Sequence, residues 1–94
     1  MTVFVEHFLN EAGRDYFSTW LTEVRRALVD FPGFGRLTEM TDVERPERAL
    51  LFLTFDSLDN LRHWGGSEAH RRVLERIRPY QLRKQYSQLL RPRE

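Results

Sequence analysis

The chain has 94 residues, and none of them is a cysteine. This length is typical of one domain, so we expect a single domain over residues 1–94. The missing cysteines exclude disulfide bonds, thiolate metal ligands and cysteine nucleophiles. The longest nearly apolar stretch, Ala49–Phe55, is far shorter than the ~20 residues that cross a bilayer. Since the first residues also lack a basic, signal-like start, we expect a cytoplasmic protein that does not enter a membrane.

The net charge of +1 hides a segregation along the chain. Residues 1–61 carry six basic and eleven acidic side chains, whereas residues 62–94 carry nine basic and three acidic ones. Such asymmetry is typical either of an anion-binding half or of a dipolar surface with solvated helix faces. The second interpretation is favoured.

The first half of the chain predicts a strand, a helix and a second strand. Residues Val3–Leu9 are β-branched and aromatic, which is typical of a strand. After Asn10–Gly13 we expect a helix, which Pro32 and Gly33 end. Phe34–Thr41 is expected to form the second strand. The helix shows an apolar stripe at three- and four-residue steps, made of Phe17, Trp20, Leu21, Val24, Leu28 and Phe31.

The second half predicts a strand, an interrupted helix and a last strand. Asp42–Arg48 is expected to be an exposed loop, and Ala49–Phe55 a strand that is apolar on both faces. Ser57 can cap a helix that Gly65 and Gly66 interrupt, and Ser67 can cap its continuation. The inward stripe of that continuation is His70, Val73, Leu74 and Ile77. Pro79 ends it, and Leu82–Leu90 is expected to form the final strand.

The order β-α-β-β-α-β predicts an α+β, ferredoxin-like domain. Its four-stranded antiparallel sheet would carry two helices on one face. Because the first and third strands are apolar on both faces, the second face also needs a cover. We expect a homodimer that packs sheet to sheet, giving a dimeric α+β barrel. One of Leu51 and Leu53 is then expected to face the partner and the other the helices.

Three motifs follow one another on this topology. They are Gly13-x3-Phe17-x2-Trp20-Leu21, Phe31-Pro32-Gly33-Phe34 and Phe55-Asp56-Ser57-x3-Leu61-x2-Trp64-x2-Ser67-x2-His70. Together, over about Val3–Tyr80, they resemble the antibiotic biosynthesis monooxygenase (ABM) superfamily of dimeric α+β barrels. The nearest likeness is to its small, mostly uncharacterised bacterial members.

The resemblance implies a cofactor-independent monooxygenase that oxidises an electron-rich aromatic, polyketide-like substrate. The catalytic Asn, Trp and Tyr of the family's second helix map onto Asn60, Trp64 and His70, with histidine in place of tyrosine. The haem-degrading members ligate haem with a His ten residues after the Trp, where this chain has Leu74. We therefore expect no cofactor and no metal.

The residues themselves suggest a pocket between the second helix and the sheet. Trp64 borders the double glycine and faces the sheet, so its indole can line a pocket or pack as a core aromatic. Trp20 and His7 are counted with Trp64 as substrate-binding residues. If Val3, Val5 and His7 face the helices, His7 and His70 converge on one cavity. If the other face turns inward, Glu6 takes that place as a buried carboxylate with a raised pKa.

Two other functions fit parts of the sequence. A non-catalytic ligand-binding or structural homodimer would use the same residues only for packing. An RNA-recognition domain shares this element order, and Arg48, Phe52 and Phe55 match its third-strand pattern. However, Leu50 stands where that pattern has its first stacking aromatic residue, and the negative charge of Glu6 would oppose binding of a polyanion. We expect no nucleic acid as a partner.

Overall fold

The computed structural model describes residues 1–93. The elements follow the predicted order, with the second helix divided in two. They are β1 (Thr2–Leu9), α1 (Glu11–Leu28), β2 (Phe34–Met40), β3 (Ala49–Phe55), α2 (Leu58–Gly65), α3 (Glu68–Ile77), a 3₁₀ turn (Arg78–Tyr80) and β4 (Gln81–Leu90).

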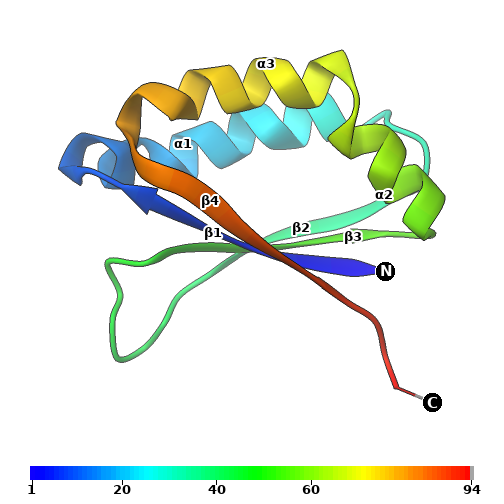
Figure 1. Ribbon diagram of the computed structural model, residues 1–94, viewed down its shortest axis with the longest axis horizontal. Helices are drawn as coiled ribbons and strands as arrows, with labels where there is room; N and C mark the ends of the chain where they lie inside the picture. The colour runs from blue at the N-terminus through cyan, green and yellow to red at the C-terminus, as the bar shows by residue number, and fades with distance from the viewer. Residues whose placement is uncertain (94) are drawn as a thin grey trace.

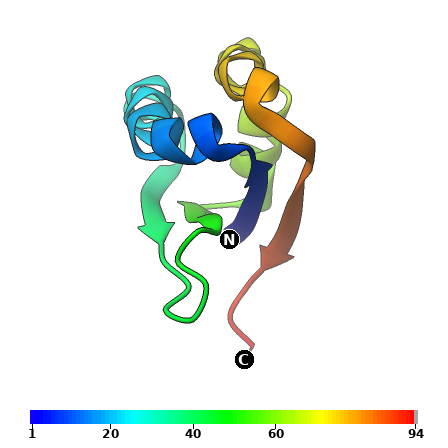
Figure 2. The same ribbon diagram turned by 90° about the vertical axis from the view of Figure 1, so that its left-hand side faces the viewer.

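The four strands form one antiparallel sheet in the order β2-β3-β1-β4. All the helices lie on one side of it, and the loop between β2 and β3 extends below the other side (Figure 1). The end-on view shows the same two layers, with the opposite face of the sheet uncovered by this chain (Figure 2). The predicted α+β, ferredoxin-like fold is confirmed.

Side-chain caps set where the helices begin. The Asn10 side chain accepts a hydrogen bond from the Gly13 backbone N–H, so α1 begins earlier than predicted, at Glu11. The hydroxyls of Ser57 and Ser67 accept from the third residue of α2 and of α3, as the sequence predicts. The Ser57 cap begins α2, and the Ser67 cap begins α3 directly after the double glycine.

The end of α1 differs from the sequence prediction. The helix ends at Leu28, so Phe31 lies in the following turn rather than on the helical stripe. Gly33 in this turn has a φ of 77°, a left-handed conformation that side chains with a Cβ seldom adopt. The Phe31 ring still reaches the core, where it stands edge-on to Trp64 with ring centroids 5.3 Å apart.

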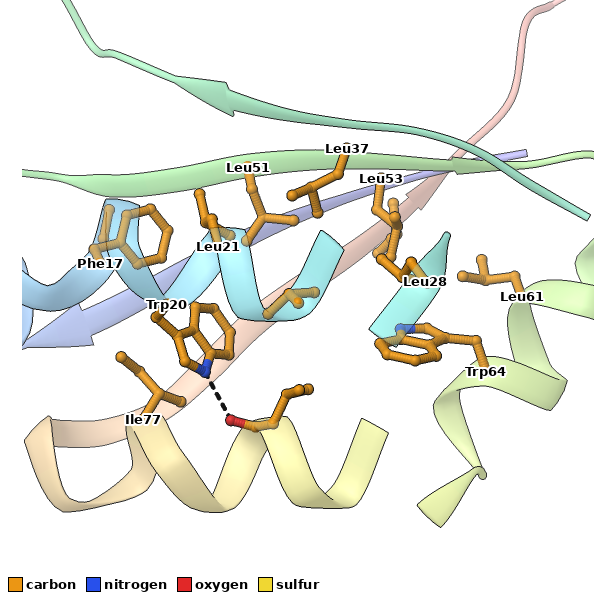
Figure 3. Close-up of a cluster of buried hydrophobic side chains, with 14 of the residues drawn as sticks. Phe17, Trp20, Leu21, Leu28, Leu37, Leu51, Leu53, Leu61, Trp64 and Ile77 are labelled. Atoms are coloured by element: carbon orange, nitrogen blue, oxygen red, sulfur yellow. Dashed lines mark hydrogen bonds between the residues drawn. The ribbon is translucent and has the colours of Figure 1, made fainter. Parts of the chain in front are cut away.

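The core lies between the sheet and the helices (Figure 3). Leu21, Leu28 and Ile77 are its fully buried side chains. Leu51 and Leu53 both point into it, which corrects the prediction that one of them faces a partner. They are two residues apart on one strand and therefore share a face. Their neighbours Leu50 and Phe52 face the opposite way.

The face of β1 that the sequence left open is now assigned. Val3, His7 and Leu9 are buried on the helix side, and His7 is only 3% exposed. Glu6 points to the opposite side, where its carboxylate pairs with the Arg48 guanidinium at 2.6 Å. That hydrogen-bonded ion pair lowers the pKa of Glu6. The alternative of a buried Glu6 with a raised pKa is therefore wrong.

No helix within residues 1–93 is long and apolar enough to cross a membrane.

Candidate functional site

A cavity of about 70 Å³ lies between the sheet and the helices. Its floor comes from β1, β2 and β3, its walls from α1, α2 and α3, and one side from β4. Most of the lining is apolar: Val5, Val24, Leu37, Leu51, Leu53, Val73 and Leu74. The polar lining atoms belong to His7, Trp20, Trp64, His70, Gln85 and Ser87.

Two tryptophans line the cavity. Both are 3% exposed, and Figure 3 shows the Trp20 indole reaching from α1 to α3 and the Trp64 indole extending from α2. The Trp20 indole N–H donates a 2.7 Å hydrogen bond to the Val73 carbonyl, so Trp20 offers the cavity only its ring. The Trp64 indole N–H forms no hydrogen bond with another residue among 1–93. Every fully buried side-chain nitrogen in that range has a partner, so this N–H is not fully buried and lies at the cavity surface. Trp64 therefore has a donor available to a ligand.

His7 lines the cavity from the middle of the sheet. Its ring stands edge-on to Trp20, with centroids 4.9 Å apart. Burial, assisted by the nearby His70, lowers the pKa of His7 to about 4. The imidazole is therefore neutral at pH 7, with one nitrogen that donates and one that accepts.

The hydrogen bonds of β4 select which nitrogen of His7 donates. The Gln81 side-chain N–H₂ lies 3.3 Å from His7 Nδ1 and also donates to Gln85 Oε1 at 2.9 Å. With Gln81 as the donor, Nδ1 accepts and the ring proton sits on Nε2. His7 thus presents an uncharged N–H group to a mostly apolar cavity.

His70 lies at the start of α3, directly after the cap. Its backbone N–H donates to the Ser67 hydroxyl at 3.1 Å, which fixes the residue at the break between α2 and α3. Its ring stands edge-on to Trp64, with centroids 5.3 Å apart. Burial lowers the pKa of His70, and a ring hydrogen bond to the Gly65 backbone partly offsets that. His70 is therefore a neutral ring beside the indole at pH 7.

Asn60 lies away from the residues that line the cavity. Its side-chain N–H₂ donates to Asp56 Oδ1 at 2.8 Å. The same amide packs so closely on Gly33 that a Cβ there would lie 2.4 Å from Asn60 Nδ2. The structure thus brings together His7, Trp20, Trp64 and His70 but places Asn60 at the base of α2.

Three polar residues of the site were missed by the sequence interpretation. Gln85 and Ser87 line the cavity from β4, and Gln81 bonds His7. The signal that could have found them is their alternation, because residues 85 and 87 share one face of a strand. A register irregularity beside His7 places Gln81 near the same cavity.

No group of three or more His, Asp or Glu side chains in the described part of the chain is arranged to hold a metal ion.

Comparisons with known proteins bear on the fold. No protein-family model and no curated protein matches the sequence. Solved structures do match. One described as an antibiotic biosynthesis monooxygenase shares 14% identity with a TM-score of 0.81, and the match covers 99% of this chain and 98% of that one.

Two further matches come with a source organism. A variant of SnoaB, a cofactor-independent oxygenase from Streptomyces nogalater, has a TM-score of 0.75 at 14% identity, covering 98% of this chain and 94% of that one. A conserved protein from Methanosarcina mazei has a TM-score of 0.85 at 10% identity, covering 98% and 91%. At the level of the fold, the resemblance seen in the sequence is therefore confirmed: this chain has the fold of the antibiotic biosynthesis monooxygenases.

Proposed function

We propose that the chain is a cofactor-independent monooxygenase that oxidises an electron-rich aromatic substrate in the cavity. The observation that carries this proposal is the convergence of two neutral imidazoles and an unpaired indole N–H on one small apolar cavity. The apolar lining suits an aromatic ring, and the few polar groups orient the reacting oxygen. The shared fold with a cofactor-independent oxygenase supports the same reaction class.

The proposed reaction begins with proton transfer to His70. The phenolic O–H gives its proton to the free ring nitrogen of His70, and the oxygen becomes an oxyanion. The N–H groups of Trp64 and His7 stabilise that charge. The electron-rich ring then transfers electrons to dioxygen, and a C–O bond forms at the carbon para to the oxyanion. Loss of water leaves a quinone, so one oxygen atom stays in the product and the other leaves as water.

The remaining predicted residues receive supporting roles. Trp20 lines the same cavity and packs against His7, and since its N–H is bonded to Val73, it contacts substrate through its ring. Asn60 is one helical turn before Trp64 and bonds Asp56, so we assign it to holding the start of α2. In this position Asn60 is a positioning residue.

The proposal is tested with 1-naphthol, whose reacting ring lies at one end of the molecule. Purified protein in air-saturated buffer is expected to form 1,4-naphthoquinone and to consume one dioxygen per quinone, above the rate of a heat-denatured sample. Trp64→Phe removes the indole donor but keeps an aromatic wall, and we expect it to slow the reaction about 10- to 100-fold. Saturable binding without quinone formation would instead favour a ligand-binding protein.

The sheet face that points away from the helices carries apolar side chains that a second copy of the chain could cover. Phe4 lies at its centre, with ring centroids 5.5 Å from Phe52 and 6.5 Å from Tyr86. Met40 and Leu90 extend the same face and are about two-fifths exposed. An aromatic and aliphatic face of this kind is seldom left open on a soluble monomer. We propose that a second copy of the chain covers it.

Charge on this face argues for a protein partner rather than RNA. Arg48 matches the basic residue of the RNA-recognition pattern, but its guanidinium pairs with Glu6 at 2.6 Å and with Asp42 at 2.8 Å. Its charge is therefore already balanced within the chain.

A further inference from the structure

The cavity continues into a surface groove between α3 and β4. Leu74 on α3 and Gln85 on β4 line both the cavity and the groove, so they mark the mouth between the two spaces. The groove has a volume of about 570 Å³ and is more open to solvent than the cavity. A molecule that enters the cavity from this side therefore leaves its outer part in the groove.

The groove is lined by cations. Besides Leu74, Gln81 and Gln85, its described lining consists of Arg78, Arg83 and Lys84, with no acidic residue among them. Arg78 follows Leu74 by four residues, so it stands beside the mouth one helical turn further on. Lys84 directly precedes Gln85 on the opposite side of the mouth.

The pairing of the neighbouring arginines makes Arg78 distinctive. Arg71, Arg72 and Arg76 on α3 all pair with carboxylates, at 2.6 to 3.6 Å. Arg78 and Lys84 form no ion pair with another residue among 1–93. The Arg83 guanidinium is engaged in a different way, 3.8 Å from the centre of the Phe8 ring. Two cations at the mouth therefore have no counter-charge from residues 1–93.

The size of the cavity decides how a ligand must lie. Its volume of about 70 Å³ is below the roughly 150 Å³ of an apolar cavity that holds benzene, so one ring at most enters, with a small movement of the walls. A substrate of two or more rings must extend out of the cavity, and the mouth between Leu74 and Gln85 leads into the cation-lined groove. Its outer part then lies within reach of Arg78 and Lys84.

We propose that the substrate carries a carboxylate on the part that stays outside the cavity, and that Arg78 and Lys84 bind it. The substrate class is thus an aromatic acid whose phenolic ring enters the cavity. A guanidinium matches a planar carboxylate with two parallel N–H donors, and the ammonium of Lys84 adds a point charge. This inference rests on the proposed function, because it takes the cavity as the place where the ring reacts.

The test compares 5-hydroxy-2-naphthoic acid with its methyl ester by isothermal titration calorimetry. Both carry the same phenolic ring, and only the acid carries a charge on the other ring. We expect the wild-type protein to bind the acid about 3- to 10-fold more tightly than the ester, because exposed ion pairs contribute modestly. The preference for the acid should shrink between ~50 and ~200 mM salt, where screening strengthens.

Arg78→Gln is the diagnostic variant, and Arg62→Gln is its matched control. Arg62 is an exposed arginine on α2 that lines neither the cavity nor the groove. Arg78→Gln should weaken binding of the acid about 3- to 10-fold and leave the ester unchanged, whereas Arg62→Gln should change neither. Arg78 is exposed, so the variant is expected to keep the wild-type circular dichroism spectrum.

The outcomes separate this inference from the proposed function. If the acid and the ester bind equally to the wild type and to Arg78→Gln, the carboxylate site is wrong while the aromatic cavity stands. If Arg62→Gln weakens binding of the acid as much as Arg78→Gln does, the overall charge of the protein rather than Arg78 attracts the acid, and the carboxylate site is again wrong. If neither compound binds at millimolar concentration, both the site and the proposed function are overturned.

Discussion

Leu51→Asp is expected to unfold the protein, whereas Phe52→Asp should leave the fold intact. Leu51 is 4% exposed and faces the helices, so the variant buries a charge among apolar side chains. An unpaired buried charge costs several kcal/mol, which is comparable with the whole stability of a domain this small. Far-UV circular dichroism and urea unfolding should show little or no folded protein at 25 °C.

Phe52→Asp and Val43→Asp are the controls for this change. Phe52 points to the opposite face of the sheet, so Phe52→Asp should give a folded monomer that sediments near 11.3 kDa. The wild type is expected near twice that mass, about 22.6 kDa. Val43 is 90% exposed, and its aspartate should shift stability by less than about 0.5 kcal/mol. A stable Leu51→Asp protein would contradict the assigned core, and a monomeric wild type would contradict the sheet-to-sheet dimer.

His70→Ala should slow quinone formation about 10²- to 10⁴-fold, the usual contribution of a positioned acid or base. The affinity for 1-naphthol should stay within a few-fold, because the ring still finds Trp64 and Trp20. Burial lowers the pKa of His70, so the neutral base is already present at pH 7. The wild-type rate should therefore fall only as the pH drops through that lowered pKa, and the variant should lose this dependence.

His63→Ala provides the comparison within the same helical region. His63 is exposed on α2, and its ring packs on Phe31 with centroids 4.8 Å apart. We expect its rate to remain within about two-fold of the wild type. If His70→Ala lowers the melting temperature and leaves the rate and its pH profile unchanged, His70 has only a packing role.

The sequence predicted the elements well because their local signals agree with the tertiary structure. The apolar run Ala49–Phe55 is β3 with the predicted bounds, and the Ser57 and Ser67 caps bracket the double glycine as expected. The end of α1 was predicted too late. Phe31 continues the helical spacing, but Pro32 and the left-handed Gly33 force the chain to turn after Leu28.

The site was predicted only in part, because side-chain partners across the sheet leave little trace in sequence. Trp64 and His70 follow from helical spacing, but the inward face of β1 does not follow from β1 alone. Glu6 points outward and pairs with Arg48, which lies far along the chain, just before β3. The amide of Asn60 is held by Asp56, which helical spacing alone did not reveal. The role of Gln81 depends on the register between β1 and β4, which no local pattern encodes.

The central claim is that a phenolic ligand enters the cavity between Trp20 and Trp64. The chain has two tryptophans, so a ¹H–¹⁵N spectrum of the labelled protein shows two indole N–H signals, which Trp64→Phe assigns. On titration with 5-hydroxy-2-naphthoic acid, we predict a large, saturable shift of the Trp64 signal as its N–H bonds the ligand oxygen. The Trp20 signal should move less, because its N–H stays bonded to the Val73 carbonyl. If both signals remain unmoved at millimolar ligand, the cavity is not a binding site.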